Sequence, residues 1–273
     1  PQLHALIEND GHVVGAGNRL AHTTDGIQWG ISKLGPFPFI GLAYGGGKYV
    51  AVSTRSATQG VAGSTDGIKW ESVAIDLDPN FSPKSITWTG TEFLMTSEKS
   101  GTAASAVGIN WQVILLPRPI TGIASSDTRQ VVVTSTGEVY QSADGLHWRR
   151  VESILSADGT VFTGGVFFTV GGRSYRSADG VEWQSTRTLN DVVWDGTQFV
   201  GVGYSGFAGV SPDGISWTRV PTETTNTLNR IVSSDTGLYT VGDRGTALRS
   251  SDATACRSEQ GIQGRHPRSR PLR

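Results

Sequence analysis

The chain has 273 residues, of which 36 are glycine and only 17% are charged. That composition, with 8 Trp and 1 Met, argues against a helical bundle, and the formal net charge of −1 lacks the basic excess of a nucleic-acid-binding protein. Cys256 is the single cysteine, which excludes an intramolecular disulfide framework, and no apolar run approaches the ~18 residues that cross a bilayer. The length allows one large domain or two small ones.

A heptapeptide recurs along the chain, beginning with Thr-Thr-Asp-Gly-Ile-Gln-Trp at residues 23–29. Its copies occupy residues 23–29, 64–70, 105–111, 142–148, 177–183 and 211–217, and a decayed seventh begins at Ser250. Successive copies end in tryptophans 34 to 41 residues apart, by subtraction of their positions, close to the repeat of a four-stranded propeller blade. The repeat therefore predicts an all-β, seven-bladed β-propeller with about four antiparallel strands per blade.

The strands of one unit can be assigned from alternating apolar residues and the turns between them. In the sixth unit we expect strands at residues 190–194, 198–203, 207–211 and 216–220, separated by Asp-Gly and Gly-rich turns. The seventh unit lacks the Gly and Trp after Asp252, so we expect an incomplete blade of three regular strands. The predicted propeller covers residues 1–254, and residues 255–273 form a basic, disordered tail.

Four positions of the heptapeptide have a clear structural role. Ser or Thr bonds back to the loop, Asp accepts from backbone N–H groups, Gly supplies a positive φ, and Trp buries apolar area between blades. The copies resemble the Asp-box, or bacterial neuraminidase (BNR) repeat, although Asp and Gly are one residue closer than in its usual form. The resemblance implies a structural role, on the face away from any ligand, for Asp25, Trp29, Asp66, Trp70, Trp111, Asp144, Trp148, Asp179, Trp183, Asp213 and Trp217.

Cations recur in the predicted turns between second and third strands. These are Arg19, Arg55, Lys99, Arg173 and Arg244, and Arg118 and Arg230 join them from loops that enter first strands. They should lie opposite the heptapeptide turns and attract an anionic ligand. Phe37, Phe39, Phe81, Tyr204 and Phe207 are candidate aromatic partners there. The alternative is that these cations are ordinary solvated turn residues.

Short tracts before two of these cations, Val13-Val14-Gly15 before Arg19 and Val241-Gly242 before Arg244, are similar to the photosystem II assembly-factor family of propellers. That resemblance implies binding of a partner protein through an arginine-rich face. A fold does not fix a function, so the ligand stays open between a protein and an acidic glycan.

The sequence offers little for catalysis. The five histidines are dispersed, so we expect no metal and no cofactor, and no nucleophile motif is present. A sialidase-like glycoside hydrolase is the alternative, because this propeller class includes sialidases. It would need a carboxylate pair, and the candidates are Asp76, Asp78, Glu98, Glu138, Glu152, Asp191, Glu223 and Asp243. We expect a non-enzymatic binding scaffold, a monomer, that binds no nucleic acid. The composition, low in lysine and rich in glycine, favours a secreted or periplasmic protein.

Overall fold

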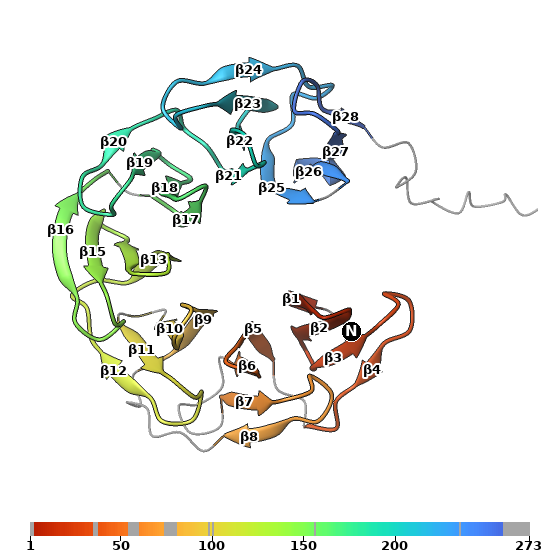
Figure 1. The fold of residues 1–273 in the computed structure, drawn as a ribbon, viewed down its shortest axis with the longest axis vertical. Coiled ribbons are helices and arrows are strands. Elements are labelled where there is room, and N and C mark those ends of the chain that lie inside the picture. Colours follow the sequence, from red (N-terminus) through yellow and green to blue (C-terminus); the bar gives the residue numbers. More distant parts are fainter. Residues whose placement is uncertain are drawn as a thin grey trace, which may run out of the picture. The chain divides into compact units, whose positions relative to one another are not determined.

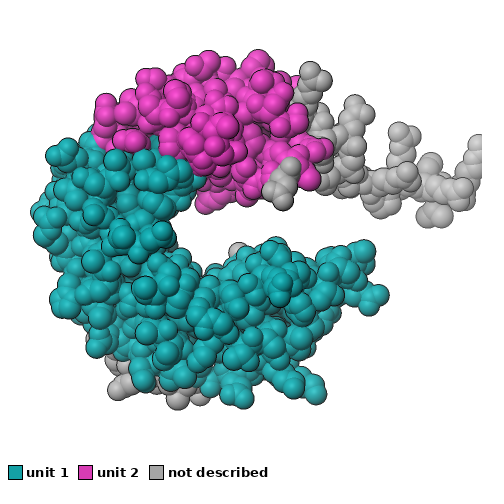
Figure 2. All heavy atoms as spheres, in the orientation of Figure 1, with its two compact units in different colours: residues 1–169, 177–183 teal, residues 170–176, 184–273 magenta. Residues whose placement is uncertain are grey.

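The computed structural model describes residues 3–34, 38–53, 60–73, 81–97, 99, 101–155, 157–234 and 236–258. The chain divides into two compact units, shown in Figure 2. Unit 1 comprises Pro1–Thr169 with Ser177–Trp183, and unit 2 comprises Val170–Arg176 with Gln184–Arg273. Within the described ranges, no helix is long and apolar enough to cross a membrane.

The described residues form seven sheets, each made of four antiparallel strands that follow one another in the sequence (Figure 1). The first strands are β1 (Leu3–Asn9), β5 (Phe39–Gly45), β9 (Pro83–Trp88), β13 (Ile120–Ser125), β17 (Gly159–Thr163), β21 (Asp191–Trp194) and β25 (Leu228–Ser234). The second strands are β2 (His12–Gly17), β6 (Lys48–Ser53), β10 (Phe93–Ser97), β14 (Gln130–Thr134), β18 (Val166–Val170), β22 (Phe199–Gly203) and β26 (Gly237–Gly242). The third strands are β3 (Ala21–Thr23), β7 (Val61–Ser64), β11 (Thr102–Ser105), β15 (Glu138–Ser142), β19 (Tyr175–Ser177), β23 (Phe207–Ser211) and β27 (Ala247–Ser250). The fourth strands are β4 (Gly30–Ile31), β8 (Glu71–Val73), β12 (Gln112–Ile114), β16 (Arg149–Ser153), β20 (Gln184–Ser185), β24 (Thr218–Val220) and β28 (Arg257–Ser258). A single turn of 3₁₀ helix, η1 (Asp243–Gly245), lies between β26 and β27.

The core lies between the faces of neighbouring sheets. Second strands such as β10, β14, β18 and β22 are buried along their whole length, which suits their β-branched and aromatic side chains. In unit 1, Val50 of one sheet packs with Phe93 and Met95 of the next. In unit 2, Val202 packs with Leu228 and Leu248 in the same way. Burial on both faces thus explains the apolar runs that mark each repeat.

The order of the strands gives every sheet two distinct ends. Because neighbouring strands are antiparallel, the first hairpin and the heptapeptide turn share one end, which we call the turn end. The loop between second and third strands and the connection to the next sheet share the opposite end, which we call the rim end. Those predicted cations that the structure describes therefore lie at the opposite ends of their sheets from the heptapeptides.

The last sheet requires a correction to the predicted domain boundary. Three regular strands, β25, β26 and β27, are present as expected, and Arg257–Ser258 adds a two-residue fourth strand, β28, paired with β27. Cys256, which the sequence analysis assigned to the tail, is only 6% exposed, and its N–H donates to Pro221 O at 3.1 Å. In the sequence it stands where the other heptapeptides have tryptophan. Its thiol side chain is a small apolar group and is buried there. The propeller therefore continues to residue 258, and residues 259–273 lie outside the described residues.

Candidate functional site

Five of the heptapeptide turns share one hydrogen-bond pattern around the aspartate. In the sixth turn, Ser211 Oγ donates to Asp213 Oδ1 at 2.8 Å, and the N–H groups of Ile215 and Ser216 donate to the same oxygen at 2.8 Å each. The same three donors converge on Asp25, Asp66, Asp144 and Asp179. The glycines that follow have φ between +67° and +73° in these turns, a region that favours glycine. Each of these carboxylates is therefore occupied by donors of its own turn.

These hydrogen bonds stabilise the ionised carboxylates. Backbone N–H donors from Ile215 and Ser216 lower the pKa of Asp213 to about 2. Donation by Gln28 and Ile27 lowers the pKa of Asp25, and donation by Lys69 and Ile68 lowers that of Asp66.

Because of the turn aspartates, the free energy of unfolding should decrease as the pH falls into the acid range. A carboxylate whose pKa is lowered by folding stabilises the protein above its unfolded pKa, about 3.9, and loses that contribution as pH falls through the folded value. We expect Asp213→Asn to lower the thermal midpoint at pH 6, and the difference from wild type to disappear as pH approaches 2. Thermal unfolding followed by circular dichroism from pH 2 to 7 measures this. Glu182→Gln, which removes an exposed charge, is the control, and a pH-independent effect of Asp213→Asn would contradict the prediction.

The tryptophans connect each turn to its surroundings. Trp70 Nε1 donates to Gly67 O at 3.0 Å within the same turn. Trp148 Nε1 donates both to Gly145 O at 2.9 Å and to Thr102 Oγ1 of the preceding sheet at 3.0 Å. The indole is therefore a polar as well as an apolar link between neighbouring sheets.

The third turn departs from this pattern. Val107 stands where the other turns carry aspartate, and Gly108 N–H still donates to Ser105 Oγ at 2.9 Å. Among the described residues, the N–H groups of Ile109 and Asn110 have no acceptor, although their equivalents in five other turns donate to a carboxylate. The buried Trp111 Nε1 also has no hydrogen-bond partner there. The register places Val61 where the next sheet has Thr102, the residue that accepts from Trp148.

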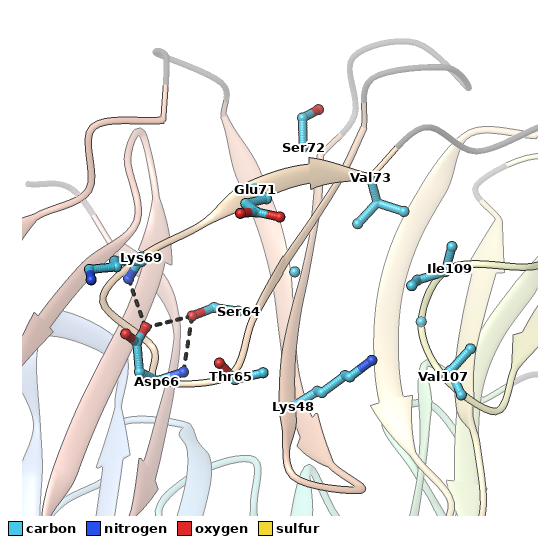
Figure 3. A pocket seen from close by; sticks show the side chains of 12 residues that line it. Lys48, Ser64, Thr65, Asp66, Lys69, Glu71, Ser72, Val73, Val107 and Ile109 are labelled. Carbon is cyan, nitrogen blue, oxygen red and sulfur yellow. Dashed lines mark hydrogen bonds between the residues drawn. The ribbon is translucent and has the colours of Figure 1, made fainter.

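A cavity of about 590 Å³ opens beside this unusual turn, between the second and third sheets of unit 1. Figure 3 shows Lys48, Glu71 and Val73 on one side and Val107 and Ile109 on the other. The amino group of Lys48 points across the cavity towards the third turn, whereas Lys69 points away from it (Figure 3). The sequence predicted binding at the rim end, whereas this cavity lies at the turn end.

An equivalent cavity of about 250 Å³ lies at the turn end of the fourth sheet, where Arg129, His147 and Arg149 contribute to its lining. Here the next turn has its aspartate, and Arg129 Nη1 donates to Asp179 O. Its cation is therefore engaged with the neighbouring turn, unlike Lys48.

Among the described residues, two carboxyl groups have raised pKa values. Burial raises the pKa of Glu92, with a smaller contribution from Asp144, and burial also raises that of Asp191. The carboxylate of Asp191 accepts from Val192 N–H at 3.0 Å and Ile231 N–H at 3.1 Å, so it links β21 to β25. The carboxylate of Asp144 makes four hydrogen bonds, with Ser142, Leu146 and His147. It is therefore not available as the second carboxylate of a catalytic pair with Glu92.

In unit 1, three predicted cations are exposed at the rim end. Arg19 lies between β2 and β3, Lys99 between β10 and β11, and Arg118 just before β13. None of them lies within ion-pair distance of a carboxylate that the structure describes. Lys84, at the same end, differs because its Nζ donates to Ile120 O at 3.0 Å. Arg55, which was also predicted, lies outside the described residues.

In unit 2, the rim end carries Arg173, Tyr204, Arg230 and Arg244, all exposed. Arg230 belongs to β25 rather than to a loop, and its Nη1 donates to Asn229 O at 3.0 Å. Arg244 lies in η1 with φ of +56°.

Most of the aromatic residues predicted as rim-end partners are buried. Phe39, Phe81 and Phe207 are at most 3% exposed, so they belong to the core, while Phe37 lies outside the described residues. Sequence reasoning also missed Arg187, whose guanidinium lies 3.8 Å from the centroid of the Phe207 ring. No sequence pattern indicated that pair, because Arg187 lies in the connection between β20 and β21 whereas Phe207 lies in β23.

The sequence matches no protein-family model and no curated protein. Solved structures with a similar fold include YCF48 bound to D1 peptide, at 20% identity and a TM-score of 0.65, covering 91% of this chain and 92% of that one. YCF48 from Cyanidioschyzon merolae matches at 15% identity and a TM-score of 0.64, covering 90% of this chain and 94% of that one. The Cps50 (Swd1) β-propeller domain from Myceliophteria thermophila matches at 11% identity and a TM-score of 0.59, covering 91% of this chain and 96% of that one. The chain is a seven-bladed β-propeller. The propeller resembles the photosystem II assembly-factor type in fold, as the sequence indicated.

Proposed function

We propose that this propeller is a non-enzymatic scaffold that binds an acidic surface of a partner protein at its rim end. The observation that carries the proposal is the exposure of Arg19, Lys99 and Arg118 without a described carboxylate in ion-pair distance. Unpaired cations on one end of a protein raise the local positive potential and speed the encounter with an anionic partner. The similar structure of YCF48 was solved with a D1 peptide bound, which supports a protein as the first partner to test.

The carboxyl groups favour the scaffold over a sialidase-like hydrolase. Glycoside hydrolysis needs two carboxyl groups placed on either side of one sugar bond. Among the described candidates at the rim end, Asp191 is held by two backbone donors, Asp243 accepts from Asn229 Nδ2 at 2.8 Å, and Glu138 lies 3.7 Å from Arg150. Asp191 and Asp243 are therefore engaged by neighbouring donors. The secreted or periplasmic location stays a prediction from composition.

The test is binding of a fluorescent ten-residue oligoglutamate peptide, followed by anisotropy at low and high salt. We expect Arg19→Glu/Arg118→Glu to weaken binding about tenfold or more, since two attractive charges become repulsive. Lys69→Glu/Arg149→Glu at the turn end makes the same change in net charge and should weaken binding clearly less than the rim-end variant does.

The outcomes separate the alternatives. Equal losses in both double variants would contradict a rim-end site, because net charge alone would then govern binding. Binding of sialylated or uronate-bearing glycans on an array, lost in the rim variant and absent for the peptide, would replace the protein partner by an acidic glycan.

A further inference from the structure

The third heptapeptide turn has the backbone of a carboxylate-binding turn but no carboxylate of its own. Gly108 has φ of +74°, like the glycines of the other turns, and Ser105 makes its usual hydrogen bond. The N–H groups of Ile109 and Asn110 therefore occupy the positions that converge on one aspartate oxygen elsewhere. A carboxylate brought by another molecule would meet two donors already arranged for it.

Lys48 adds the charge that such a ligand requires. It is partly buried on β6, and its amino group points across the cavity towards Val107 and Ile109 (Figure 3). Within the described residues no carboxylate lies in ion-pair distance of Lys48. Glu71 of β8 also lines the cavity, and its negative charge disfavours an anionic ligand near it. The third turn is therefore the end of the cavity that suits an anionic group.

The rest of the cavity fits an extended peptide. Val73, Val107 and Ile109 supply aliphatic walls, with Val107 48% and Ile109 47% exposed. The fourth strand β8 pairs only with β7 among the described strands, so its outer edge has backbone groups available for an added strand. A volume of about 590 Å³ accommodates an acidic side chain with its aliphatic neighbours.

We propose that the cavity between the second and third sheets binds an extended peptide segment of a partner protein through one acidic side chain. That carboxylate accepts from the N–H groups of Ile109 and Asn110 and pairs with Lys48. It supplies from outside the group that aspartate supplies in the other turns. This site lies at the turn end and does not depend on the rim-end function proposed above.

The experiment is a nuclear magnetic resonance titration of the full chain with acetyl-Val-Glu-Val-amide, whose only charge is the glutamate side chain. We expect saturable downfield shifts of the Ile109 and Asn110 amide protons. The matched peptide acetyl-Val-Gln-Val-amide should bind about tenfold more weakly, because a neutral acceptor replaces a charged one.

Variants test each part of the site. Val107→Asp supplies the carboxylate internally, so it should raise the thermal midpoint and abolish the response of both amides to the peptide. Lys48→Met should weaken binding about fivefold or more, whereas Lys69→Met, whose side chain points away, should leave binding unchanged.

Three results would overturn the proposal. They are equal binding of the glutamine peptide, unchanged binding by Val107→Asp, and absence of any saturable shift at Ile109 and Asn110 at millimolar peptide. The rise in thermal midpoint in Val107→Asp shows that a lost response is not caused by unfolding.

Discussion

Gly122→Ala is expected to destabilise the protein by about 3 kcal/mol, towards the upper end of the cost of overpacking. A Cβ at this position would lie 2.4 Å from Thr160 N and 2.6 Å from the carbonyl carbon of Gly159. Both atoms are backbone of β17, the first strand of the next sheet, so no side-chain rotation relieves the clash. The sheets containing β13 and β17 would have to separate.

Urea unfolding measures this effect, with Gly63→Ala as the control. A Cβ at Gly63, also within a strand, would meet only Val73 Cγ2 at 3.5 Å, an ordinary contact. We expect that control to change stability by less than about 1 kcal/mol. Equal losses in the two variants would show that glycine entropy, and not the approach of the sheets, sets the effect.

Trp70→Ala is expected to cost about 3–5 kcal/mol, the usual range for removal of a buried tryptophan. Trp70 is 8% exposed, its ring centroid lies 6.3 Å from that of Tyr49, and its Nε1 donates to Gly67 O. Trp70→Phe keeps an aromatic ring but loses the hydrogen bond, so it should cost less than the alanine variant.

The first heptapeptide supplies the comparison. Trp29 is only partly buried, and within the described ranges no hydrogen bond of its indole is found. Trp29→Ala should therefore cost clearly less than Trp70→Ala in the same urea experiment. Similar losses would mean that all heptapeptide tryptophans contribute alike, whatever their burial.

The sequence predicted the strands well because their signals are local. In the sixth unit, the expected strands at 198–203 and 207–211 match β22 and β23 to within one residue. Asp-Gly turns and alternating apolar residues act within a few positions, so the pattern reflects the structure directly. The rim-end positions of Arg19 and Lys99 follow from the same strand order.

What sequence reasoning missed depends on contacts between sheets. The tight approach at Gly122 involves a strand nearly forty residues away, and no local pattern marks it. Cys256 stands at a tryptophan position and is buried there, but its side chain does not resemble tryptophan, so no sequence pattern indicated it. Val107 was visible in the third heptapeptide, but its meaning appears only when Lys48 and the cavity are seen beside it.

The turns complete their aspartate hydrogen bonds within three residues along the chain, as Asp66 does with Ile68 and Lys69. A mutation in one turn therefore leaves the same bonds in the other turns untouched, and stability behaves as a sum over neighbouring repeats. Such a chain tolerates substitutions in one blade while the other blades maintain the fold. Loss of one carboxylate then exposes two donors to solvent at that blade alone, which gives evolution a route to a new recognition surface by a single substitution.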